Sequence, residues 1–152
     1  MTPKEEDRHM FDPNAETLWI ETGAMQGGSR NQLELTDDIA RYFGDQARED
    51  EIIVIQMVPG VQHVRPFVYR GDDYGHYTER WRLCLPTAQM GGPEYPDRVV
   101  RFDRLTVGGA TVFQLTVADR NSAVHNAWRG SSAPPNGDTD TTFGGREYGW
   151  WT

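Results

Sequence analysis

Two long runs of alternating apolar residues constrain the fold of this chain more than any other feature. They cover residues 98–105 and 110–118, and the pair Gly108-Gly109 separates them. Such alternation is typical of half-buried strands, and two glycines between the runs predict a tight hairpin turn. A second hairpin is predicted over residues 52–58 and 61–70. The inward face of the first hairpin is expected to hold Val100, Phe102, Leu105, Val112, Phe113, Leu115 and Val117.

The rest of the chain adds shorter strands and little helix. Residues 18–20, 32–35 and 77–85 have the pattern of short strands. A short helix is predicted over residues 37–43, because Thr36 is a suitable cap. A second short helix is expected within residues 119–129. Many short strands with one or two short helices favour a mainly β (α+β) fold, either a small mixed barrel or a twisted sheet.

The 152 residues have the length of a single domain. Residues 1–16 are polar and are expected to form a mobile lead-in, and residues 17–130 form the β-rich domain. Residues 131–142 are rich in Ser, Pro, Gly, Asp and Thr and resemble a linker. Residues 143–152 form an aromatic C-terminal tail. The tail either packs back onto the domain or begins a second one, and the sequence leaves both alternatives open.

The charge of the chain is unevenly distributed. The formal net charge is −8, which argues against a strongly basic, non-specific nucleic-acid binder. Residues 1–51 hold 13 Asp and Glu against 5 Lys and Arg, whereas residues 61–130 hold 9 Arg against 7 Asp and Glu. Fourteen of the 15 basic residues are arginine, which binds planar acceptors through two hydrogen bonds. A high genomic GC content is the alternative explanation for this preference.

Several classes of protein and site are disfavoured. No apolar run reaches membrane-spanning length, and the acidic N-terminus lacks the apolar core of a secretory signal. Cys84 is the only cysteine, which excludes an internal disulfide and favours a reducing cytoplasm. The four histidines do not have metal-ligand spacing, and no nucleophile, phosphate-binding or dinucleotide motif is present. We therefore expect no metal and no cofactor, and the chain is more typical of a binding module than of an enzyme.

Two segments carry side chains suited to nucleic-acid recognition. A polar, Gly-rich loop precedes the strand at residues 32–35, and it contains Arg, Asn and Gln, which grip base edges with paired hydrogen bonds. In the second segment, alternation places Trp81 in the core and Arg80 and Arg82 on the surface. The alternative for these two arginines is a solvated pairing with Glu79 or Asp73.

The stretch GGSRNQLELTDDIARYF, residues 27–43, resembles the start of the DNA-binding pseudobarrel domains of plant transcription factors and bacterial restriction endonucleases. The hairpin YPDRVVRFDRLTVGGATVFQLTVAD, residues 95–119, resembles their closing strands. The resemblance spans residues 18–118. It implies an open pseudobarrel of about seven strands with two short helices, whose two arms hold DNA in the major groove.

The resemblance also implies the site residues and the partners. The first arm maps to Gln26, Ser29, Arg30, Asn31 and Gln32, and the second arm maps to Arg70, Tyr74, His76, Tyr77, Thr78, Arg80 and Arg82. Such modules read a short sequence of double-stranded DNA. In restriction-modification enzymes they target or activate a nuclease domain, so a separate nuclease domain or subunit is the second expected partner.

Two other classes of function remain as alternatives. The first is a non-enzymatic protein-interaction domain or a structural β-domain of phage or accessory type, whose acidic surface and aromatic tail serve protein contacts. The second is a small-ligand barrel enzyme in which Asp73, His76 and Glu79, together with Asp72, act as an acid/base group. A solvated hairpin loop is the simpler explanation for that group.

Overall fold

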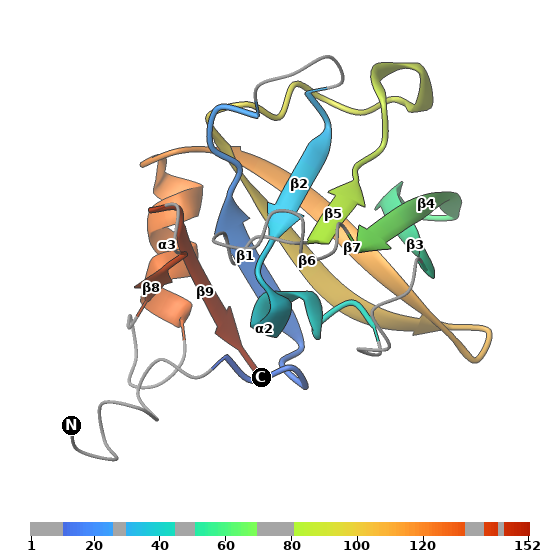
Figure 1. The fold of residues 1–152 in the computed structure, drawn as a ribbon, viewed down its shortest axis with the longest axis horizontal. Helices are drawn as coiled ribbons and strands as arrows, with labels where there is room; N and C mark the ends of the chain where they lie inside the picture. The colour runs from blue at the N-terminus through green and yellow to red at the C-terminus, as the bar shows by residue number, and fades with distance from the viewer. Residues whose placement is uncertain (1–10, 26–29, 45–50, 70–80, 133–138, 143–144) are drawn as a thin grey trace.

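The computed structural model describes residues 11–25, 30–44, 51–69, 81–132, 139–142 and 145–152 (Figure 1). These residues form one nine-stranded sheet in the order β2-β5-β4-β3-β7-β6-β1-β9-β8, curled into an open half-barrel. Neighbouring strands are antiparallel except β3 and β7, which run parallel. The strands are β1 (Thr17–Glu21), β2 (Gln32–Leu35), β3 (Glu51–Val58), β4 (Val61–Tyr69), β5 (Trp81–Cys84), β6 (Arg98–Val107), β7 (Ala110–Asp119), β8 (Asp140–Thr141) and β9 (Glu147–Trp151).

The predicted mainly β fold is confirmed, but the expected count of about seven strands is too low. The difference comes from the C-terminal segment, which adds β8 and β9 to the sheet. β9 pairs with β1, where Leu18 lies opposite Trp150. Phe11 packs edge-on against Trp150 at 5.3 Å between ring centroids, and Phe11 and Ala15 are buried. The aromatic tail therefore packs onto the domain, and the segment from Phe11 onward belongs to the core rather than to a mobile lead-in.

The β6–β7 hairpin has an unbroken register of ten residue pairs, from Arg98 opposite Asp119 to Val107 opposite Ala110. Gly108 and Gly109 both have positive φ, as a two-residue turn that matches strand twist requires. Phe102 and Leu115 are buried opposite each other on the inner face. The predicted phase is wrong for Leu105 and Val112, because strict alternation places this pair on the other face.

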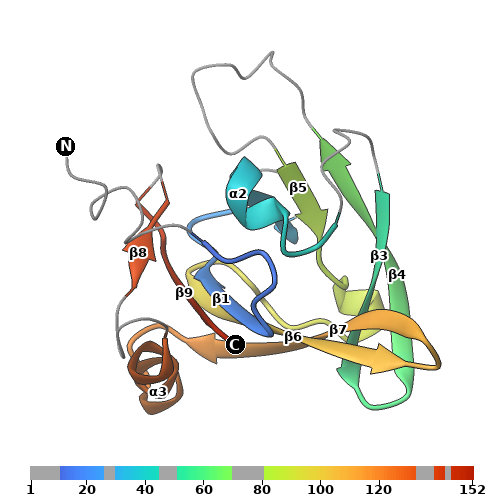
Figure 2. The same ribbon diagram turned by 90° about the horizontal axis from the view of Figure 1, so that it is seen from below.

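The interior of the curled sheet is filled by the segment around the short helix α2 (Asp37–Ala40) (Figure 2). The helix is one turn shorter than predicted, since the chain leaves it as a turn after Ala40. Thr36 is at the cap position, but its hydroxyl donates to Asp38 Oδ1 rather than accepting from the helix backbone. The turn after the helix delivers Phe43 against Phe102 and Phe113, at 4.9 and 5.1 Å between ring centroids.

The longest helix in the described part of the chain is α3 (Ala123–Ser131), not the predicted helix after Thr36. Ser122 caps it by accepting a hydrogen bond from the backbone N–H of His125. The helix packs beside β7 and β9, where Trp19 and Trp128 form a second apolar cluster with Val99 and Ala118. A short 3-10 helix, η2 (Ala88–Met90), lies between β5 and β6.

Candidate nucleic-acid interface

Four of the twelve residues predicted to contact DNA lie in the described part of the chain. They are Arg30, Asn31, Gln32 and Arg82. The other eight lie outside the described residues: Gln26, Ser29, Arg70, Tyr74, His76, Tyr77, Thr78 and Arg80. The four described residues occupy the base of each predicted arm, on and beside the strand pair β2–β5.

The register of the β2–β5 pair separates an inner face from an outer face. Leu35 lies opposite Trp81, and Leu33 lies opposite Leu83; all four side chains are fully buried. The intervening pairs, Gln32 opposite Cys84 and Glu34 opposite Arg82, point the other way. We call these four outward residues, Gln32, Glu34, Arg82 and Cys84, the β2–β5 face. The prediction that Trp81 lies in the core and Arg82 on the surface agrees with this arrangement.

Arg82 forms an ion pair across the two strands. Its Nη2 lies 3.1 Å from Glu34 Oε1, and the Glu34 side chain is 47% exposed. Neither Glu79 nor Asp73, the partners in the alternative explanation for Arg82, lies in the described part of the chain. An exposed pair of this kind contributes about 0–1 kcal/mol to stability. Arg82 is therefore held in place by a contact that another anion could replace at little cost.

Asn31 anchors the loop that leads into β2. Its side-chain amide donates to the backbone carbonyl of Leu85 at 2.8 Å, and the backbone carbonyl of Asn31 accepts from the backbone N–H of Leu85 at 2.8 Å. These bonds continue the β2–β5 ladder by one residue, and they bury the Asn31 side chain. The amide that was expected to reach a base edge is thus bonded inside the protein.

Arg30 precedes this anchor and is exposed. Its φ is 53°, in the left-handed region that a non-glycine residue adopts at a cost on the order of 1 kcal/mol. Asn31 follows Arg30 directly, and its two bonds to Leu85 hold it in place. They therefore help to fix the left-handed backbone conformation of Arg30. The result is an exposed arginine with a constrained backbone, two residues before Gln32.

The two predicted arms meet the β2–β5 face at opposite ends. Gln32 lies opposite Cys84 at one end of the strand pair, whereas Trp81, the first described residue after most of the second arm, lies opposite Leu35 at the other end. The two ends are three residue steps apart along the strand, or about 10 Å. That distance corresponds to roughly three nucleotides along one DNA strand.

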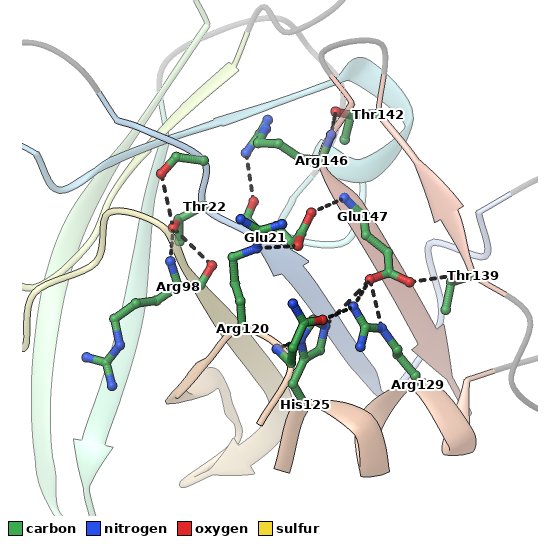
Figure 3. A network of polar contacts seen from close by, with 12 residues as sticks. Glu21, Thr22, Arg98, Arg120, His125, Arg129, Thr139, Thr142, Arg146 and Glu147 are labelled. Carbon is green, nitrogen blue, oxygen red and sulfur yellow. Dashed lines mark hydrogen bonds and ion pairs between the residues drawn. The ribbon is translucent and has the colours of Figure 1, made fainter. Parts of the chain in front are cut away.

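Arg146 closes the side of the sheet next to β2, a role that the sequence did not suggest. Its guanidinium donates to the backbone carbonyl of Glu21 on β1 (Figure 3). It also donates to the backbone carbonyl of Glu34 on β2. The side chain lies against Gly23, where an added Cβ would come within 3.0 Å of the Arg146 Cδ. Since β2 is an edge strand, these bonds cover part of an otherwise unpaired edge.

A second polar cluster joins β1, α3 and β9 (Figure 3). Glu21 is 8% exposed, and its carboxylate accepts from Arg120 Nε and from the backbone N–H of Glu147, each at 2.8 Å. The carboxylate of Glu147 accepts from Arg129 Nε at 2.9 Å and from Thr139 at 3.0 Å. No sequence motif marked this cluster, because its members come from segments far apart in the chain.

His125 completes the cluster and is fully buried. Its Nδ1 accepts from the backbone N–H of Asn121 at 2.9 Å, which assigns the remaining proton to Nε2. That atom faces Glu147 Oε1 at 3.6 Å. Burial, and then the charge of Arg129, lower the pKa of His125, so the ring is neutral at pH 7. Because the two carboxylates already accept internal hydrogen bonds, the cluster holds α3 and β9 on β1 rather than presenting an acid/base pair.

The remaining chemical signals are few. Within the described segments, no three His, Cys, Asp or Glu residues are placed to hold a metal ion. The predicted acid/base group of Asp72, Asp73, His76 and Glu79 lies outside the described residues. No helix among those described is both long and apolar enough to cross a membrane. No known protein family, curated protein or solved structure matches the chain.

Proposed function

We propose that this chain is a sequence-specific binding module for double-stranded DNA, with the β2–β5 face and the adjoining loops as its contact surface. The observation that carries the proposal is the register that aligns Gln32 and Arg82 on one outward face, next to the exposed Arg30. As the resemblance implies, it serves as a targeting or effector domain for a nuclease, in a bacterial restriction-modification setting in the cytoplasm.

The affinity comes from a small number of arginines rather than from net charge. Arg30 pairs with a guanine edge or a neighbouring phosphate. Arg82 exchanges Glu34 for a phosphate, which the weak, exposed ion pair permits. Glu34 then lies beside the bound backbone and repels phosphates that are not in register. In an acidic protein this repulsion favours specific over loose binding.

Selection of bound sequences from a random duplex pool, at low salt, is the first test. The Arg30→Ala variant is then expected to bind the selected duplex about 5- to 150-fold more weakly, the equivalent of 1–3 kcal/mol. Its binding to random duplex should change much less. Arg41→Ala is the matched control, because Arg41 is also an exposed arginine but follows α2 instead of preceding β2.

Each other outcome of this experiment has a definite meaning. Equal weakening on selected and random duplex would make Arg30 a phosphate contact. No weakening on either would remove the loop before β2 from the site. If the folded protein binds no duplex at low salt, DNA binding is wrong.

An apolar surface favours protein interaction as the second candidate function. Ile52 on β3 is 70% exposed and Val64 on β4 is 57% exposed. They share the outer face of the β3–β4 hairpin with Val54 and Pro66, as the register of the hairpin requires. Neighbouring exposed aliphatic side chains are typical of protein contact sites. The double change Ile52→Ser and Val64→Ser should lower the binding of an apolar dye to the native protein, which fluorescence measures.

A further inference from the structure

The sheet splits between its two parallel strands, β3 and β7. They pair only where Ile55 and Gln56 meet Phe113 and Gln114. Upstream of Ile55 the strands diverge, and a pocket of about 370 Å³ lies between them, bounded also by residues 41–44 after α2. This volume is at the lower end of the range for small-molecule sites. The β2–β5 face does not contribute to it.

The pocket has an apolar floor and a polar rim. Tyr42, Phe43, Ile53 and Phe113 line it and are buried. Arg41 and Thr111 line it and are exposed. Small-molecule sites typically combine an apolar lining with a few placed polar groups. This division gives the pocket one place for an apolar body and another for a charged group.

Arg104 supplies a fixed positive charge at the wall. It lies opposite Phe113 on the inner face of the β6–β7 hairpin, and its guanidinium carbon is 4.5 Å from the centroid of the Tyr42 ring. Its Nη2 donates to the carbonyls of Pro13 and Tyr42 at 2.8 and 2.7 Å. Within the described chain, its Nε and Nη1 make no such bond. The Arg104 side chain is therefore held in place, while its Nε and Nη1 groups remain available to donate hydrogen bonds to a ligand.

The two arginines of the pocket lack acidic partners among the described residues, unlike five of the eight other described arginines. Five described arginines have a carboxylate within 3.1 Å: Arg82, Arg98, Arg101, Arg120 and Arg129. Neither Arg41 nor Arg104 has one within salt-bridge distance in the described part of the chain. None of the described lining residues is acidic, and the nearby carboxylate of Glu51 has an oxygen 2.9 Å from the position that a Cβ on the lining residue Gly44 would take. In a chain of net charge −8, an unneutralised, half-buried guanidinium is a candidate anion site.

We propose that this pocket binds a small organic anion, a carboxylate or phosphate attached to a ring or short apolar chain. The anionic group lies against Arg104 and Arg41, and the apolar body packs on Tyr42 and Phe113. This site is separate from the proposed DNA surface, and neither proposal depends on the other. The carboxylate and phosphate ligands share one feature, which is a negatively charged oxygen group attached to an apolar body.

The test uses phenyl phosphate and benzoate as probes. Inorganic phosphate and phenol, the two component parts of phenyl phosphate, are the comparison ligands. Isothermal titration measures affinity, and amide chemical shifts locate the contact. Phenyl phosphate or benzoate should bind at least about tenfold more tightly than either half alone, because both parts of the pocket contribute. The tighter of the two probes distinguishes a phosphate ligand from a carboxylate ligand.

Two variants decide the result without altering the bonds of Arg104. Arg41→Ala should weaken the probe about 2- to 5-fold, as expected for an exposed ion pair. Thr111→Trp should abolish binding by filling the pocket from an exposed strand position. Arg30→Ala is the matched control and should have no effect. The proposal is overturned if neither probe binds at a concentration of 10 mM, which is roughly the weakest useful affinity. It is also overturned if the Thr111→Trp variant binds the probe as tightly as the wild type does.

Discussion

Two parts of this protein use the same pairing of arginine with glutamate for different purposes. On the β2–β5 face, Arg82 and Glu34 form one contact, and the Glu34 side chain is 47% exposed. In the cluster that joins β1 to β9, Glu21 is nearly enclosed and accepts from both a guanidinium and a backbone N–H. The comparison shows that burial, rather than residue type, separates a contact that holds the fold from one that is available for exchange.

The largest expected effect comes from breaking the enclosed cluster. Glu21→Ala should lower the free energy of unfolding by about 1–3 kcal/mol, because the backbone N–H of Glu147 loses its acceptor, whereas Arg120, whose side chain is 49% exposed, is resolvated. Urea unfolding at pH 7 measures this change. Glu21→Gln keeps an acceptor and should cost less. A loss below about 1 kcal/mol for Glu21→Ala would mean that water replaces the carboxylate freely.

The next effect is a dependence of stability on pH. The pKa of His125 is lowered in the folded state, chiefly by burial, so below about pH 6.5 the unfolded chain binds more protons. The free energy of unfolding should therefore be flat above this pH and fall as the pH drops through 6.5 towards the folded pKa. Burial raises the pKa of Glu147, but hydrogen bonds from Arg129 and Thr139 outweigh it and lower the pKa overall. Glu147 thus adds a further loss only below about pH 4.5.

The variant His125→Asn separates the two contributions to this profile. It removes the titrating ring, so its stability should stay level between pH 8 and pH 5.5 while the wild type declines. Urea unfolding at half-unit steps of pH compares the two proteins. A decline of equal size in both would assign the pH dependence to another group.

Part of this architecture follows from the sequence and part does not. The β6–β7 hairpin was predictable because ten consecutive residue pairs and a glycine turn carry one local pattern. β9 was not, since it is short and contains Gly149, which breaks the alternation. That glycine is needed because a Cβ there would lie 2.7 Å from Trp19 Nε1. Glu21 and Glu147 meet across 126 residues of chain, and no local spacing indicates such a contact.

The candidate site divides in the same way. The sequence placed Trp81 inside and Arg82 outside, because alternation along a strand fixes both. It did not indicate that Glu34 is the partner of Arg82, since cross-strand pairing depends on the register. Nor did it indicate the anchoring bond of Asn31, since this bond requires Leu85 to lie beside the loop. A surface residue and a structural residue of the same polar type are distinguished only by what lies next to them.

A smaller effect is expected when the exposed pair is released. Glu34→Gln removes the charge that competes with phosphate for Arg82, so affinity for duplex DNA should rise about 2- to 5-fold. The gain should be larger on random than on selected duplex, because Glu34 penalises contacts out of register. Fluorescence anisotropy at several salt concentrations measures both. A fall in affinity would show that Glu34 itself orients Arg82 for binding.

The smallest effect concerns the stability of the same variant. Glu34→Gln should change the free energy of unfolding by less than about 1 kcal/mol, because an exposed ion pair gains little over solvation. This change in the free energy of unfolding should be smaller at high salt than at low salt, since screening weakens the interaction of exposed charges. Urea unfolding at two salt concentrations checks this, with Glu21→Gln as the enclosed counterpart, whose loss should persist in salt. If the two variants lose equal stability with equal salt dependence, the distinction between an exchangeable and a structural ion pair fails, and Arg82 would then be too firmly held to leave Glu34 for a phosphate.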